Sequence, residues 1–437
     1  MTERTTVKND FLKEKYEKIV HKSGLSIYVF PKKLSTAYAA LSVRFGSLDG
    51  AFRFEEEPEL ITMPDGIAHF LEHKMFESED HIDTFDKFAA VGASANAYTS
   101  NEVTSYLFST PDDIAPALRI LMNYVFSPYF TEKNVEKEKG IIAQEIKMYD
   151  DSPGSRLYYA VMELLYIDHA IRKNICGTCE TIRDITPELL MRCYRAFYHP
   201  SNMILTVCGD VDTDTVLSIV DEALTDVSTP PRIIRDLPLA ETEIFAKSKE
   251  FHMDIARPKV CIGIKDTELP QAPRDRERRA LIMNLICDLY FGESTPFFER
   301  LYESGLISHD FSACYETTAG CGHMLFTAAT DDPEALRAEL LAELARITDG
   351  KAPSQEDFER IRRVHYAEYI KDFDNTEEIA TALLDSIVDG VELFETANAL
   401  TSIELSELLT VAGRFFSEDR LAYATVYPMN GRITTNA

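Results

Sequence analysis

The sequence has no tryptophan, no apolar run of 18 or more residues, and far fewer basic than acidic side chains. Without such a run we expect no segment that spans a membrane. The 45 lysines and arginines against 73 aspartates and glutamates give a net charge of −28. That balance argues against nucleic acid and anionic membranes as partners, and would suit basic peptides, although a soluble surface is the commoner reason for acidity.

The sequence also lacks an apolar signal core near its N-terminus and any cysteine framework typical of secreted domains. Residues 1–20 are charged and polar, and eight cysteines are scattered along 437 residues. This usage is typical of reduced thiols, so we expect a cytoplasmic protein. The one close pair, Cys176 and Cys179, has no second pair and no strand–helix context, which favours an incidental role.

The chain is too long for one ordinary core, and it contains an internal repeat. Leu107-Phe108 matches Leu325-Phe326 at an offset of 218 residues, with elements of the same type around both. The Pro-bearing segment 227–240 lacks a clear period and predicts a linker. We therefore predict an α+β fold of two homologous domains, each a mostly antiparallel sheet flanked by helices, at 1–226 and 241–437.

The most informative stretch is residues 66–76, which have the pattern of an amphipathic helix with Asp65 as its N-cap. His69 and His73 are four residues apart, so they project from one face, with Glu72 at its edge. Two neutral imidazoles can hold zinc, and a carboxylate beside them can take a proton from metal-bound water.

The repeat indicates that only the first domain carries this chemistry. The offset of 218 residues places Cys287 where His69 stands and Tyr290 where Glu72 stands. At these two positions the second domain therefore has neither a histidine ligand nor a carboxylate base.

A hydrolytic zinc site needs a third protein ligand. The helix expected from Thr131 to about Tyr149 offers Glu138 and Glu145, which are seven residues apart and therefore share a face. Apolar neighbours, among them Ile141, bury part of this helix, and a buried carboxylate needs a partner such as a metal. Glu136 lies on another face and is expected to be solvated.

The pattern His69-x-x-Glu72-His73, followed by Glu138 and Glu145, resembles the insulinase/pitrilysin family of inverted-motif zinc metallopeptidases. The match is closest to the family's short, two-domain bacterial members of the processing-peptidase type. The resemblance implies one Zn²⁺ per chain, held by His69, His73 and Glu145. It further implies that Glu72 is the catalytic base, and that Glu138 orients a ligand from outside the metal's own coordination.

The resemblance continues through residues 92–99, the strand that pairs with substrate backbone in this family. Asn96 and Ala97 are thereby implied as substrate-binding residues, which would act by adding a peptide strand to the sheet edge. The resemblance also extends over residues 197–203 and weakly over the second half.

One departure from the family pattern lies in the second half. Active members carry an arginine and a tyrosine there, seven residues apart, whereas this chain has Tyr302 and Ser308; Arg300 and Tyr315 are nearby but out of register. The resemblance therefore implies that this chain is the metal-bearing half of a heterodimer. Its homologous partner would supply the Arg/Tyr pair, with a homodimer as the other arrangement.

Together these patterns predict a zinc-dependent endopeptidase of the peptide- or precursor-processing type that acts on extended or unfolded peptides. The alternative is a non-catalytic binding or assembly subunit with the same fold, although a scaffold has no use for a base beside a metal. The eight remaining histidines are expected to be structural or solvated. They are His21, His81, His169, His199, His252, His309, His323 and His365.

Overall fold

The computed structural model describes residues 3–429, and the chain divides by its contacts into two compact units. The first unit comprises Met1–Ile146, Asn174–Leu237 and Tyr369–Phe394. The second unit comprises Lys147–Lys173, Pro238–Glu368 and Glu395–Ala437. The outer ends of the two predicted domains, residues 1–2 and 430–437, lie outside the described residues.

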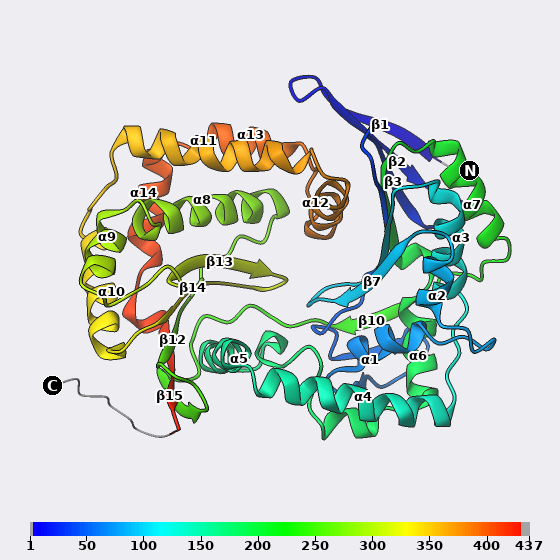
Figure 1. Cartoon of the computed structure of the whole chain (residues 1–437), viewed down its shortest axis with the longest axis horizontal. Helices are drawn as coiled ribbons and strands as arrows, with labels where there is room; N and C mark the ends of the chain where they lie inside the picture. The colour runs from blue at the N-terminus through cyan, green and yellow to red at the C-terminus, as the bar shows by residue number, and fades with distance from the viewer. Residues whose placement is uncertain (1–2, 430–437) are drawn as a thin grey trace. The chain divides into compact units, whose positions relative to one another are not determined.

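A seven-stranded sheet forms the centre of the first unit (Figure 1). In sheet order its strands are β1 (Glu3–Asn9), β2 (Glu14–Val20), β3 (Ser26–Pro31), β9 (Met203–Gly209), β4 (Ala37–Val43), β8 (Thr104–Thr110) and β7 (Ser94–Thr99). Neighbouring strands are antiparallel except β3 and β9, which are parallel. β7 is an edge strand whose partner in the sheet is β8.

Helices cover both faces of this sheet, which explains why β4 and β9 are buried along their whole length. α3 contacts β4 and β8, whereas α12 contacts β4 and β9 from the other side (Figure 1). The helices of this unit are α1 (Ile67–Met75), α2 (Thr84–Ala89), α3 (Ile114–Val125), most of α4 (Glu132–Asp150), α6 (Pro187–Phe197), α7 (Thr213–Ala223) and α12 (Thr376–Asp389). Short 3₁₀ turns are η2 (Thr181–Asp184) and η3 (Pro200–Asn202).

The second unit contains a five-stranded sheet. In sheet order its strands are β11 (Ser248–Met253), β15 (Leu421–Pro428), β12 (Lys259–Lys265), β14 (Cys321–Ala329) and β13 (Ser312–Thr318). Its helices are α5 (Pro153–Leu165), α8 (Pro273–Phe291), α9 (Pro296–Glu303), α10 (Pro333–Thr348), most of α11 (Gln355–Asp372), α13 (Glu395–Ser402) and α14 (Leu405–Phe415), with 3₁₀ turns η1 (Ala170–Arg172) and η4 (Glu418–Arg420).

The two sheets share one topology, which agrees with the internal repeat. The order β3-β9-β4-β8-β7 in the first unit corresponds to β11-β15-β12-β14-β13 in the second. In each series the first pair is parallel and the others are antiparallel. The predicted α+β fold with mostly antiparallel sheets is confirmed. Cys287 and Tyr290, the counterparts of His69 and Glu72, lie buried in the apolar core of the second unit.

The predicted linker contains a strand, and two local expectations need correction. Within segment 227–240, Ile233–Asp236 forms β10, which pairs with β5 (Ala51–Phe54) beside β6 (Ile61–Thr62) in a small sheet. The N-cap of α1 is Gly66, in a left-handed conformation, and not Asp65. Ile141 is 45% exposed, so it is not one of the apolar residues that bury a face of α4.

The assignment of α5 and α12 could not be read from the linear repeat. α5 contacts β12 and β15 and belongs to the second unit, while α12 belongs to the first. The passage between units at Leu237 and Pro238 falls inside the predicted linker, and the domain boundaries themselves stay a prediction. Among the described residues, no helix has the length and apolar character needed to cross a membrane.

Candidate metal and active site

α1 presents its two histidines side by side. The imidazole rings of His69 and His73 have centroids 4.6 Å apart, as their spacing of one helical turn requires. His69 and Glu72 are buried, whereas His73 is partly accessible. His69 Nδ1 is buried without a hydrogen-bond partner among the described residues. The Nε2 side of the His69 ring is therefore the side that faces a carboxylate, that of Glu145.

α4 brings two carboxylates to these histidines. Glu145 Oε1 lies 3.5 Å from His69 Nε2, and Glu145 Oε2 lies 3.4 Å from His73 Nε2. The hydrogen bonds with the two imidazoles hold the pKa of Glu145 well below its usual range. The structure thus brings His69, His73 and Glu145 together, while their role as metal ligands stays a prediction.

Glu138 lies behind His73. Its Oε1 is 3.1 Å from His73 Nδ1, and its Oε2 is 3.5 Å from the ammonium of Lys74, which is fully buried. Burial alone lowers the pKa of His73, but its hydrogen bonds with Glu138 and Glu145 outweigh burial and raise that pKa to about 9. A carboxylate on the Nδ1 side fixes the orientation of an imidazole whose Nε2 faces a metal.

Glu72 is held by the neighbouring strand β7. Thr99 Oγ1 donates a hydrogen bond of 2.6 Å to Glu72 Oε2. Burial raises the pKa of Glu72, and this effect is larger than the opposing effect of the Thr99 hydrogen bond. A carboxylate with a raised pKa accepts a proton more readily near neutral pH, which suits a general base.

The residues present fit a divalent cation. The carboxylates of Glu138 and Glu145 lie beside the two imidazoles, with Glu72 on the same helix as both histidines, and the ammonium of Lys74 contacts Glu138 at the edge of this group. Their summed charge is negative, and two imidazole nitrogens with a carboxylate are a ligand set that zinc prefers.

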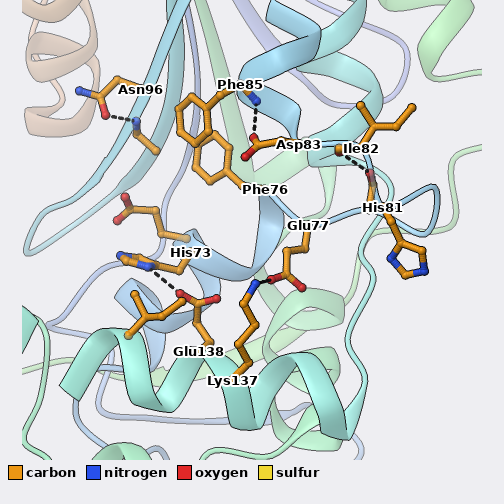
Figure 2. A pocket seen from close by; sticks show the side chains of 14 residues that line it. His73, Phe76, Glu77, His81, Ile82, Asp83, Phe85, Asn96, Lys137 and Glu138 are labelled. Carbon is orange, nitrogen blue, oxygen red and sulfur yellow. Dashed lines mark hydrogen bonds and ion pairs between the residues drawn. The ribbon is translucent and has the colours of Figure 1, made fainter. Parts of the chain in front are cut away.

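A pocket of about 670 Å³ opens beside Glu72 and His73. Figure 2 shows His73 and Glu138 pointing toward one another, with the stacked rings of Phe76 and Phe85 above them. The predicted substrate-binding residues Asn96 and Ala97 also line this pocket. The sequence did not indicate its apolar wall, which consists of Phe76, Ile82, Phe85 and Ile141.

Three contacts at the site were not predicted: those of Thr99, Lys74 and Cys176. Cys176 Sγ lies 3.8 Å from His69 Nε2, a position that the sequence did not indicate. Strand alternation could have indicated Thr99, which shares a face with Ala97. No local signal marks Cys176, because it meets His69 from 107 residues away.

The loop that carries Cys176 fits closely against the start of α1. A Cβ on Gly177, whose φ is +73°, would lie 2.2 Å from the carbonyl oxygen of Asp65, and one on Gly66 would lie 2.4 Å from that of Cys176. Thr181 Oγ1 donates to the same Asp65 carbonyl at 2.8 Å. Only glycine allows this approach of two backbones.

We expect Gly177→Ala to destabilise the protein more than a left-handed alanine does by itself, which is about 1–3 kcal/mol. Gly92→Ala is the matched control, because Gly92 has a φ of +74° in the same unit and its Cβ would meet only Asp112 Oδ2, at 3.2 Å. Urea denaturation of each variant measures the difference. Equal shifts of the two midpoints would show that the close approach to Asp65 costs nothing.

The second unit places the Arg/Tyr candidates in other interactions. Arg300 pairs with Glu339 at 2.7 Å, and the buried Tyr315 hydroxyl donates to Asp266 at 2.8 Å. Tyr302 is 44% exposed and stacks on Phe298. Ser308 donates to Asp310. In these contacts Arg300 and Tyr315 do not take the place of the family's Arg/Tyr pair.

The surroundings of Glu136 and of five other histidines are also defined. Glu136 is exposed and pairs with Lys139 at 3.2 Å, as expected for a solvated position. His81 lines the pocket but is exposed. His21, His169, His199 and His323 are buried with hydrogen-bond partners.

Two family models and several known proteins match this chain. The model of the insulinase family (peptidase family M16) matches residues 32–178, and that of the peptidase M16 inactive domain matches residues 184–364. The uncharacterized zinc protease YmfH of Bacillus subtilis is 38% identical over 409 residues, which cover 93% of this chain and 95% of that protein.

Solved structures show the same relationship. One described as an M16-like peptidase, from Alicyclobacillus acidocaldarius, is 31% identical with a TM-score of 0.89, covering 98% of both chains. Pitrilysin, at 18% identity and a TM-score of 0.75, shares the fold: 98% of this chain covers 47% of that one. The site motif, the duplicated sheet topology and these matches together place the chain in the insulinase family of peptidases, family M16.

Proposed function

We propose that this chain is a zinc-dependent endopeptidase of the peptide- or precursor-processing type. The observation that carries the proposal is the convergence of His69 and His73 on the two oxygens of Glu145, with Glu72 beside them. Relatives named zinc proteases support zinc as the metal, and the proposal takes one ion per chain. In this assignment His69, His73 and Glu145 hold the ion, which supplies a Lewis acid that polarises the scissile carbonyl and makes water acidic.

The protein's own groups carry out the rest of the reaction. Glu72 takes a proton from the attacking water and returns it to the leaving nitrogen of the peptide bond. Thr99 occupies Oε2 of Glu72, which leaves Oε1 for this transfer. Glu138 holds the ring of His73 in place through Nδ1.

Substrate is expected to bind as an added strand along the edge strand β7. Asn96 and Ala97 line the pocket that contains Glu72 and His73, so a peptide on this edge passes the proposed base. Main-chain pairing gives affinity without strict side-chain selection, and the wall formed by Phe76 and Phe85 favours an apolar side chain next to the cleaved bond. Extended or unfolded peptides are therefore the proposed substrates.

The proposal includes a partner chain. Arg300 and Tyr315 are engaged with Glu339 and Asp266, which supports a homologous partner as the source of an Arg/Tyr pair. This chain covers 47% of the pitrilysin chain, so two chains of this size together match the length of one pitrilysin chain. A heterodimer is the preferred arrangement, and a homodimer is the alternative.

Cleavage of an unstructured peptide, followed by mass spectrometry of the products, tests the proposed function. We expect activity that disappears after treatment with a zinc chelator and returns on addition of zinc, because the ligand set remains intact. Activity that survives complete metal removal would overturn the zinc mechanism. If the metal-loaded chain lacks activity both alone and with a co-purified homologous chain, the non-catalytic alternative replaces the proposal.

A further inference from the structure

The cysteine loop brings a thiol to the candidate metal site. Cys176 is 5% exposed, and its backbone N–H donates to Asn174 Oδ1 at 2.9 Å. Gly177 packs closely against Asp65 and Gly66, just before α1. The position of Cys176 is therefore set by backbone contacts within the first unit, on both sides of the thiol.

The thiol completes a compact group of three different ligand types. One ligand atom each from His69, Glu145 and Cys176 lies within 4.8 Å of the other two. The Sγ atom is 3.8 Å from His69 Nε2. Zinc bonds of about 2.3 Å to sulfur and about 2.1 Å to nitrogen, at a tetrahedral angle, separate the two ligand atoms by about 3.6 Å.

The neighbouring cysteine does not share this position. Cys179 Sγ points to the carbonyl oxygen of Ala143, 3.9 Å away, on the body of α4. The close pair in the sequence is therefore not a two-cysteine metal motif. His69, by contrast, is 7% exposed and directs Nε2 toward both Glu145 and Cys176. The group consists of one imidazole from α1, one carboxylate from α4 and one thiol from the loop before η2, and His73 stands outside it, facing the second oxygen of Glu145.

We propose that Cys176 is a fourth protein ligand, which closes the metal position otherwise open to water in the resting protein. This inference rests on the metal site of the proposed function. When the sulfur binds, the S–H bond breaks, its electron pair forms the sulfur–metal bond, and the proton leaves to solvent. A closed four-ligand set is typical of structural zinc, so catalysis requires Cys176 to leave or the coordination to expand to five ligands.

A sulfur ligand also changes which metals the site prefers. Thiolates favour thiophilic cations, whereas imidazole and carboxylate alone do not. We therefore expect the ratio of Cd²⁺ affinity to Zn²⁺ affinity to be larger for the wild-type chain than for Cys176→Ser. Competition between the two metals, followed by metal analysis, measures this factor.

X-ray absorption of the zinc-loaded wild-type chain tests the ligand directly and needs no variant. We expect one sulfur neighbour at about 2.3 Å among nitrogen and oxygen neighbours at about 2.0–2.1 Å. A spectrum with only nitrogen and oxygen neighbours would overturn the assignment of Cys176 while leaving the proposed zinc site standing. Failure to load any zinc would overturn both.

Cobalt substitution gives an independent readout. The Co²⁺ form of the wild-type chain should show a thiolate-to-cobalt charge-transfer band in the near ultraviolet together with the visible bands of bound cobalt. Cys176→Ser should lose the charge-transfer band and keep the visible bands, and Cys179→Ser should keep both. Identical near-ultraviolet spectra of wild type and Cys176→Ser would contradict the proposal.

Discussion

Glu72→Gln is expected to reduce kcat/KM for peptide cleavage by about 10²–10⁴-fold, the range typical of losing a general base. The amide has nearly the shape of the carboxylate and can still accept the hydrogen bond from Thr99, which is 2.6 Å long in the wild-type protein. It cannot take a proton at neutral pH. Steady-state kinetics with one peptide, at several substrate concentrations, separates kcat from KM.

Metal content decides whether this loss has the stated cause. Glu72 is placed beside the ligands and not among them, so Glu72→Gln should retain zinc at the wild-type level. Glu136→Gln is the control on the neighbouring helix, because Glu136 is exposed and pairs with Lys139 of the same helix; it should leave activity unchanged. If Glu72→Gln releases the metal, Glu72 is a ligand and the assignment of the base is wrong.

Glu145→Gln is expected to have the largest effect on metal binding. Glu145 faces both histidines, at 3.5 and 3.4 Å, and its charge is the nearest counter-charge for a cation between them. Its loss should lower zinc affinity by more than the 10- to 100-fold that is typical of removing a hydrogen-bond partner of a ligand. Competition with a chelating dye measures the affinity.

Glu138→Gln is the matched comparison for Glu145→Gln, because both residues lie on the same face of α4 and both contact His73. Glu138 reaches Nδ1 and not Nε2, so its loss should weaken zinc binding by about 10- to 100-fold only. Thermal melting of both variants checks that each remains folded, since Glu138 also faces the buried Lys74. If Glu138→Gln lowers zinc affinity more than Glu145→Gln does, the roles of the two carboxylates are reversed.

Local spacing was sufficient for much of the site. His69, Glu72 and His73 lie on one short helix, so the period of the helix alone places the two imidazoles together. Glu138 and Glu145 share a face of α4 for the same reason. The repeat likewise indicated two similar sheets, because hydrophobic periodicity and turn residues recur in the same order.

Expectations were weaker where a short local signal had to compete with tertiary contacts. β10 forms in the Pro-bearing segment because β5 offers it a pairing edge. The polar N-terminus forms the hairpin of β1 and β2, although its composition gives little sign of a strand. α9, α12 and α13 were likewise not anticipated from the sequence. α12 is amphipathic but is fixed by contacts with β4 and β9, which are more than 150 residues away.

By itself, the sequence determined which groups share a helix face: a histidine pair with a carboxylate on one helix, and a carboxylate pair on another. The period of a helix fixes which side chains share a face, and this information is local. Only the tertiary structure decided that Thr99 holds Glu72, that Lys74 balances Glu138, and that Cys176 approaches His69. These contacts depend on how separate elements pack, and packing is governed by close approaches, such as that of Gly177 to Asp65, which no residue pattern specifies.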